Sequence, residues 1–119
     1  MMSRVSLLPK HRRLVRDILA EHLPPEAAVW VFGSRATGRA WRYSDLDLAV
    51  DAGRRLTLDE TAMLAEAFSE SDLPYRVDIV DWRSLAPAFR KRIARERVAL
   101  SEAAQFAAAV GTDPGTSGT

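Results

Sequence analysis

The sequence contains no cysteine, which excludes disulfide bonds, cysteine-ligated zinc and thiol catalysis. It also has no apolar run of about 18 residues, the length that a membrane-spanning helix needs. Residues 1–10 lack the long apolar centre of a signal peptide. We therefore expect no membrane association and a cytoplasmic location. The formal net charge is only +1, which argues against direct binding of nucleic acid through bulk electrostatics.

Histidine is scarce, and this limits the metal sites that the chain can build. The two histidines are His11 and His22, and no second histidine stands at ligand spacing from either, so a histidine-ligated metal is not expected. With 119 residues, 47% of them apolar, the chain is long enough for one globular domain. We expect that domain over residues 1–100, a helix over 101–110 and a flexible tail over 111–119.

One stretch, VWVFGSRATGRAWRYSDLDLAVD, combines an apolar strand, a turn of small residues and two acids. Val29–Phe32 is a continuous apolar run that predicts a buried strand, and Gly33 ends it. Asp45–Val50 begins with alternating acidic and apolar residues, which predicts a second strand with Asp45 and Asp47 on one face. Two carboxylates exposed together at the end of an apolar sheet indicate a functional site.

The flanking sequence predicts helices and one further strand. Apolar residues at helical spacing predict a helix from about Leu8 to Leu23, which ends before two prolines. Thr57 and Glu60 form a capping-box pattern, which predicts a helix that continues to about Ser69. The remaining expected elements are a strand over Tyr75–Trp82, a helix from Ser84 with Pro87 in its first turn, and an alanine-rich helix over Ser101–Val110.

Asp78 lies inside the third predicted strand and adds a carboxylate to those of Asp45 and Asp47. Neighbouring strands lie about 4.8 Å apart, so the three side chains can converge on one small volume. Carboxylates that close repel one another unless a cation lies between them. Oxygen-only ligands favour Mg²⁺, with Mn²⁺ as an alternative, and two such ions can support displacement at a phosphorus atom.

The turn formed by Gly33 and Ser34 supplies the second feature of the expected site. It follows a buried strand and leads into a predicted helical turn, so its N–H groups and the Ser34 hydroxyl could hold a triphosphate. Arg35 directly follows Ser34, and we expect it to contact the phosphates. The segment imitates a P-loop, but Arg39 and Ala40 stand where lysine and serine or threonine are required, which excludes a P-loop.

These residues carry a resemblance to a known family. Gly33-Ser34, then ten residues, then Asp45-Leu46-Asp47 resembles the GS-x10-DxD signature of the DNA polymerase beta-like nucleotidyltransferase superfamily. GSRATG followed by SDLDLAV is similar to its minimal nucleotidyltransferase branch, and VDIV at 77–80 resembles the strand that carries the third acid. The resemblance implies an α/β fold of the α+β type, in which helices cover a small mixed β-sheet.

The resemblance also implies roles for the motif residues. Gly33 and Ser34 would contact the phosphates of ATP, the donor. Asp45 and Asp47 would bind both metal ions, and Asp78 would complete one metal site and help to deprotonate the attacking hydroxyl. AMP would move to that hydroxyl as pyrophosphate leaves.

Asp81 is a second candidate for the third acid. We favour Asp78 because apolar residues flank it in mid-strand, whereas Asp81 precedes Trp82 at the predicted end of the strand. The choice between the two stays open at the level of sequence.

The acceptor of the AMP group is not visible in the motif. A domain of this size has no room for a dedicated acceptor lobe, so we expect an oligomer or a complex with a partner protein. Minimal nucleotidyltransferases occur as antitoxins beside HEPN-family ribonuclease toxins, and some transfer AMP from ATP to a toxin tyrosine. The resemblance therefore implies an antitoxin that adenylylates a HEPN-type partner.

Two other functions remain open. The chain could be a small-molecule nucleotidyltransferase of the kind that modifies aminoglycosides, with an oligomer forming the acceptor pocket. It could instead be a non-catalytic antitoxin that neutralises its partner by binding alone. The basic helix face from Arg90 to Arg97 could contact a partner or RNA in any of these cases, and a solvated surface is its default explanation.

Overall fold

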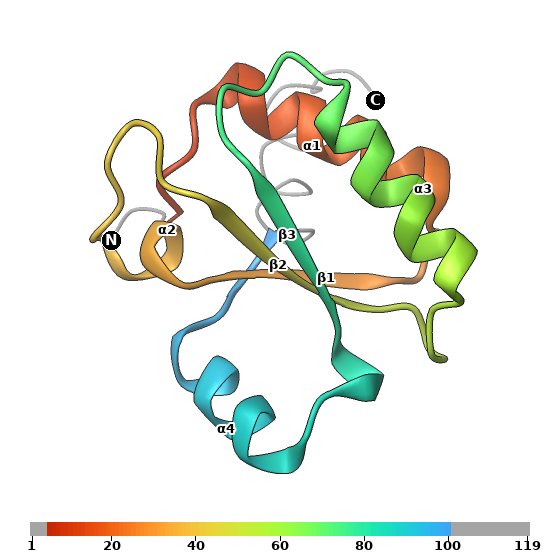
Figure 1. Ribbon diagram of the computed structural model, residues 1–119. Coiled ribbons are helices and arrows are strands. Elements are labelled where there is room, and N and C mark those ends of the chain that lie inside the picture. The colour runs from red at the N-terminus through yellow and green to blue at the C-terminus, as the bar shows by residue number, and fades with distance from the viewer. Residues whose placement is uncertain (1–4, 101–119) are drawn as a thin grey trace, which may run out of the picture.

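The computed structural model of the chain describes residues 5–100. Helices lie on both sides of one sheet, as Figure 1 shows. Within the described part, no helix has the length and apolar character needed to cross a bilayer. The elements in chain order are α1 (Pro9–His22), β1 (Ala28–Phe32), α2 (Ser34–Thr37), β2 (Leu46–Asp51), α3 (Leu58–Ser69), β3 (Val77–Asp81), the 3₁₀ helix η1 (Trp82–Ser84), α4 (Pro87–Glu96) and β4 (Val98–Ala99).

The sheet is mixed, with the strand order β3-β2-β1-β4. Strand β1 pairs antiparallel with β2 and with β4, whereas β2 pairs parallel with β3. The chain passes from β2 to β3 through α3. The predicted α/β fold with a small mixed sheet is therefore confirmed. One consequence of the parallel pairing is that Asp47 and Asp78 are register partners.

The two faces of the sheet have different coverings. Helices α1 and α3 lie side by side over one face, and α4 lies on the opposite side (Figure 1). Alternation along β2 explains this layering, because its even-numbered residues are fully buried against α1 and α3 while Asp47 and Asp51 lie on the other face. The core between these two helices and the sheet includes Val15, Ile18, Val31, Leu46, Leu48, Val50, Leu64 and Phe68.

On the second face, α4 contacts the sheet through aromatic and aliphatic side chains. Phe89 meets Phe32 edge to face with ring centroids 6.4 Å apart, and Ile93 is buried. The exposed side of α4 is basic, as the sequence predicts, and α4 begins later than predicted. The Asp81 carboxylate accepts the Arg83 N–H and starts the short η1 helix, so α4 begins at Pro87 instead of Ser84.

The other elements predicted within residues 5–100 agree with the structure to within about two residues. Strand β4 was not expected, because two residues are too few to show alternation. The alanine-rich helix predicted over Ser101–Val110 and the predicted tail lie outside the described residues.

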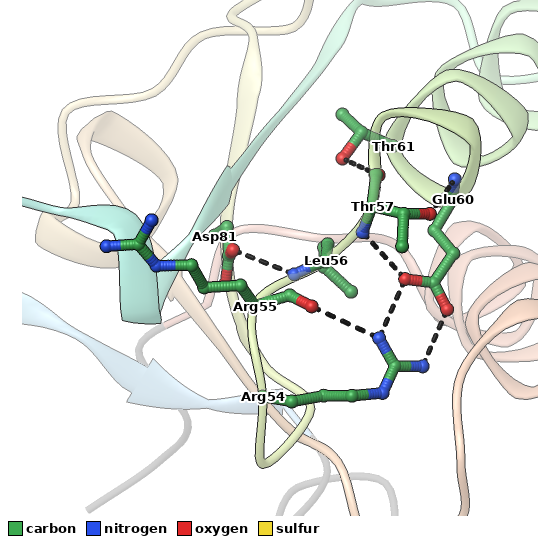
Figure 2. Close-up of polar contacts among 7 residues, drawn as sticks. All are labelled: Arg54, Arg55, Leu56, Thr57, Glu60, Thr61 and Asp81. Carbon is green, nitrogen blue, oxygen red and sulfur yellow. Dashed lines mark hydrogen bonds and ion pairs between the residues drawn. The ribbon is translucent and has the colours of Figure 1, made fainter.

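The start of α3 has the capping box that the sequence predicts (Figure 2). The Thr57 hydroxyl accepts the Glu60 N–H at 3.0 Å, and the Glu60 carboxylate accepts the Thr57 N–H at 2.8 Å. Arg54 donates to both oxygens of the same carboxylate, at 2.8 and 2.6 Å. Asp81 accepts the Leu56 N–H at 2.9 Å, so the end of β3 and the start of α3 are held together.

Replacing Thr57 by alanine removes the hydroxyl that accepts the Glu60 N–H. Because that amide then loses its partner in the protein, we expect Thr57→Ala to lower the free energy of unfolding by about 1 kcal/mol in urea denaturation. Thr61→Ala is the matched control, since the Thr61 hydroxyl donates to the backbone carbonyl of Thr57, which Thr61→Ala and Thr57→Ala both leave in place, and alanine is the better helix former. An equal loss of stability in both variants would contradict the capping role.

Candidate active site

Gly33 connects β1 to α2 in a conformation that other residues rarely adopt. Its φ is 76°, and a Cβ at this position would collide with the carboxylate of Asp47. Glycine is therefore required for two independent reasons, the backbone angle and the closeness of an acidic side chain. Ser34 follows as the first residue of α2 and is half-buried. The turn thus lies directly against the carboxylate of Asp47, one of the predicted site residues.

Asp47 and Asp78 lie side by side on the sheet face that α4 partly covers. They are register partners in the parallel pair β2–β3, which is why their side chains share a face. Asp45 immediately precedes β2 and is exposed. The Asp78 carboxylate accepts a hydrogen bond from Arg76 at 3.0 Å, and this ion pair is largely open to solvent. Three of the predicted acids are thus neighbours at one end of the sheet.

Burial raises the pKa of Asp47 to about 6, and the neighbouring carboxylates add to this effect. In decreasing order, the contributing neighbours are Asp78, Asp45 and Glu96. Each of these negative charges makes the ionised form of Asp47 less favourable. The acidic side chains therefore give the site a negative charge that a bound cation would offset.

The chemistry of this donor set fits a hard divalent cation, because the candidate ligands are carboxylate oxygens and the local charge is negative. Among residues 5–100, however, no three histidine or acidic side chains are arranged to hold a metal ion. The positions of two of the acids explain this. The Asp78 carboxylate is bonded to Arg76, and Asp45 is exposed to solvent. The acids are therefore of a kind that binds a divalent cation and lie near one another, but they do not form a preorganised metal site within residues 5–100.

Glu96 is a fourth acid at this site, and the sequence analysis missed it. Its carboxylate accepts the Gly33 N–H at 2.7 Å, so the last residue of α4 reaches the glycine turn. The turn amide that we expected to face a phosphate is thus bonded to an acidic side chain. The available signal was weak, because Glu96 is simply the only acid in the otherwise basic and apolar α4.

The structure gives Arg35 a different position from the one expected. The residue is only 5% exposed, and its guanidinium donates to the backbone carbonyls of Ser6, Arg42 and Ser44 at 2.8 to 3.0 Å. It also lies 4.0 Å from the centroid of the Tyr75 ring. Because these contacts occupy the guanidinium, Arg35 holds the α2–β2 connection in place instead of projecting toward the glycine turn.

Asp81, the other candidate for the third acid, is engaged elsewhere. Its carboxylate accepts the N–H groups of Leu56 and Arg83 and the Ser84 hydroxyl. Its register partner in β2 is Val50, three positions beyond Asp47. Asp81 therefore serves the turns at the far end of β3, which supports the preference for Asp78.

A family profile described as "Polymerase beta, Nucleotidyltransferase" matches residues 15–105 of the chain. The chain is also similar to a Haemophilus influenzae protein named "Probable protein adenylyltransferase MntA". The two are 46% identical over 89 residues, which is 75% of this chain and 77% of the relative.

Solved structures with the same fold include two that are informative. A crystal structure of a toxin–antitoxin with AMP-PNP superposes with a TM-score of 0.66 at 28% identity, over 75% of this chain and 71% of the matched chain. A structure proposed to be a minimal nucleotidyltransferase gives a TM-score of 0.58 at 42% identity, over 75% of this chain and 88% of the other.

Asp47→Asn removes a carboxyl group whose pKa is higher in the folded chain than in the unfolded chain. The charged form is therefore destabilising at pH values above 6, and protonation relieves this as the pH falls toward the unfolded pKa of 3.8. We expect Asp47→Asn to raise the free energy of unfolding by roughly 1 kcal/mol near pH 8, with solvent screening taken into account, and by less near pH 4.5.

Urea denaturation of both proteins at the two pH values measures this difference. Asp72→Asn, at an exposed loop position, is the control and should change stability little at either pH. A less stable Asp47→Asn variant near pH 8 would show that the carboxylate stabilises the fold, contrary to this expectation.

Proposed function

The chain belongs to the polymerase beta nucleotidyltransferase family, and from this premise we propose that it transfers AMP from ATP to a hydroxyl group of a HEPN-type ribonuclease toxin. The acceptor hydroxyl is that of a tyrosine, and the modification neutralises the toxin, so the chain acts as an antitoxin. The observation that carries this proposal is the 46% identity, over three quarters of the chain, to a protein named as an adenylyltransferase.

The donor is ATP, and its phosphates bind at Gly33 and Ser34. A similar solved structure is a toxin–antitoxin with AMP-PNP, an ATP analogue, which supports both the donor and the kind of partner. The absence of a side chain at Gly33 lets phosphates approach the backbone closely. The Glu96 carboxylate, which accepts the Gly33 N–H, leaves that amide when the nucleotide binds.

Asp45, Asp47 and Asp78 hold Mg²⁺, as two ions, with Mn²⁺ as a substitute. Bound Mg²⁺ would neutralise charge on the phosphates and offset the burial and the repulsion that together raise the pKa of Asp47. Asp78 turns away from Arg76 to join the site, which costs little because that ion pair is exposed.

The reaction is a displacement at the α-phosphorus of ATP. The acceptor hydroxyl oxygen forms a bond to this phosphorus, the bond to the bridging oxygen of the β-phosphate breaks, and pyrophosphate leaves with the electron pair. Asp78 accepts the proton of the hydroxyl. The chain contributes positioning and a charged environment, which is most of what phosphoryl-type transfer requires.

The test is incubation with Mg²⁺, ATP and the HEPN-family protein encoded beside this chain, followed by mass spectrometry of that protein. We expect the mass of AMP to be added to a tyrosine. Asp78→Asn, and Asp45→Asn combined with Asp47→Asn, should slow the transfer by roughly 100-fold or more, because they remove charge-stabilising groups from the site.

Asp81→Asn is the matched control for the third acid. It should lower stability through the lost contacts with Leu56 and Ser84 while the folded variant keeps its transfer rate. Full activity of Asp78→Asn together with loss in Asp81→Asn would reverse the assignment. Toxin neutralisation by the Asp45→Asn, Asp47→Asn variant without AMP transfer would show that binding alone is the mechanism.

A further inference from the structure

A cavity lies at the same end of the sheet as the carboxylates, beside the start of α1. Its volume is about 650 Å³. It is bounded by the residues that open α1, by the α2–β2 connection and by the residues that precede β3; the connection is the yellow loop beside α2 in Figure 1. The lining residues that matter below are Leu8, Lys10, Trp41, Arg42 and Tyr43.

Three of the large side chains that line this cavity are exposed and apolar or aromatic. Trp41 is 66% exposed, Leu8 is 56% exposed and Tyr43 is 51% exposed. Within the described residues, only Leu58 and Met63 are comparably exposed large apolar side chains, and both belong to α3. Clustered exposed apolar residues indicate interaction surfaces, and tryptophan, tyrosine and arginine dominate the binding energy of protein interfaces.

The exposed aromatic residues stand on a loop whose backbone is fixed from within. The buried guanidinium of Arg35 donates to the carbonyls of Trp41, Arg42 and Ser44, and the Trp41 N–H donates to the Ser44 hydroxyl at 2.9 Å. The rings of Trp41 and Tyr43 meet edge to face, with centroids 5.5 Å apart. A surface ordered in advance loses less entropy on binding, which favours a docking role over an accidental exposure.

The charges around the cavity are of one sign. Lys10, Arg42 and the buried Arg35 line it, and none of its lining residues is acidic. The negative charges gather instead at Asp45, two residues after Tyr43, and at Asp47 beyond it. A partner that carries acidic side chains is therefore attracted to the cavity and repelled from the carboxylates, which fixes its orientation.

We propose that this cavity docks an acidic segment of the acceptor protein, with Trp41 and Tyr43 as the apolar anchors and Arg42 and Lys10 as its ionic partners. Docking here brings the acceptor hydroxyl to the neighbouring carboxylate site, so this inference rests on the proposed function. A protein segment is favoured over single-stranded RNA because few cations are present and the adjacent acids would repel a phosphate chain.

The test measures the affinity of the HEPN-family partner for this chain by isothermal titration calorimetry. Trp41→Ala combined with Tyr43→Ala, and separately Arg42→Glu, should each weaken the complex about tenfold or more. Leu58→Ala combined with Met63→Ala is the matched control, since it removes two other exposed apolar side chains, both on α3, and it should change the affinity less than about twofold. Binding of Mg²⁺–AMP-PNP should be unchanged in all these variants.

Several results would overturn the proposal. These are no complex with the wild-type chain, equal affinity of the Trp41→Ala, Tyr43→Ala variant and wild type, or loss of AMP-PNP binding in that variant. Binding of a single-stranded RNA oligonucleotide that the variant loses, with the protein complex intact, would assign the cavity to nucleic acid.

Mass spectrometry of the wild-type and variant mixtures, after addition of ATP, separates the docking proposal from the proposed transfer. A complex that depends on Trp41 and Tyr43 but adds no AMP to the partner supports docking and contradicts the proposed transfer. If all variants keep both the affinity for the partner and the AMP transfer, the result supports the proposed transfer and contradicts docking at this cavity.

Discussion

The burial and mutual repulsion of carboxylates on neighbouring parallel strands are the constraint on which the rest of this site depends. The register of β2 with β3 places Asp47 beside Asp78, and burial then raises the pKa of Asp47 to about 6. The surroundings limit this repulsion without removing it. Gly33 leaves room for the Asp47 side chain, and Asp78 turns toward Arg76. A fold that keeps such a cluster at a cost in stability is consistent with a cation and a polyphosphate as the ligands of the site.

The connection between α2 and β2 joins the carboxylate site to the cavity that we propose docks the acceptor. Its last residue before β2 is Asp45, and Tyr43, two residues earlier, lines the neighbouring cavity. Arg35 fixes both regions at once, because its guanidinium binds the carbonyls of Ser44 and of residues at the cavity rim. The ten residues between the glycine-serine turn and the aspartates therefore do more than set a spacing. They form a segment held by the Arg35 guanidinium, between the proposed donor site and the proposed acceptor surface.

The sequence predicted the parts of the structure that depend on local pattern. Alternation in β2 and the Thr57 capping box were both sufficient for correct assignments, and the strand positions of Asp47 and Asp78 followed from the same reasoning. Contacts between residues far apart in the sequence could not be predicted from local pattern. Glu96 is 63 positions from Gly33, and nothing in a basic helix indicates that its last side chain reaches that turn. Arg35 was misjudged because its neighbour Ser34 suggested a ligand, whereas three-dimensional packing buried its guanidinium under backbone carbonyls.

We propose that the carboxylates beside Gly33 form a metal-dependent nucleotide site. Equilibrium binding of AMP-PNP to the chain, with Mg²⁺ and with a chelator, tests this proposal. We expect binding to require the divalent cation, and we expect Asp47→Asn to lose both this dependence on Mg²⁺ and most of the affinity. Equal affinity with and without Mg²⁺, or unchanged Mg²⁺-dependent binding by Asp47→Asn, would contradict it.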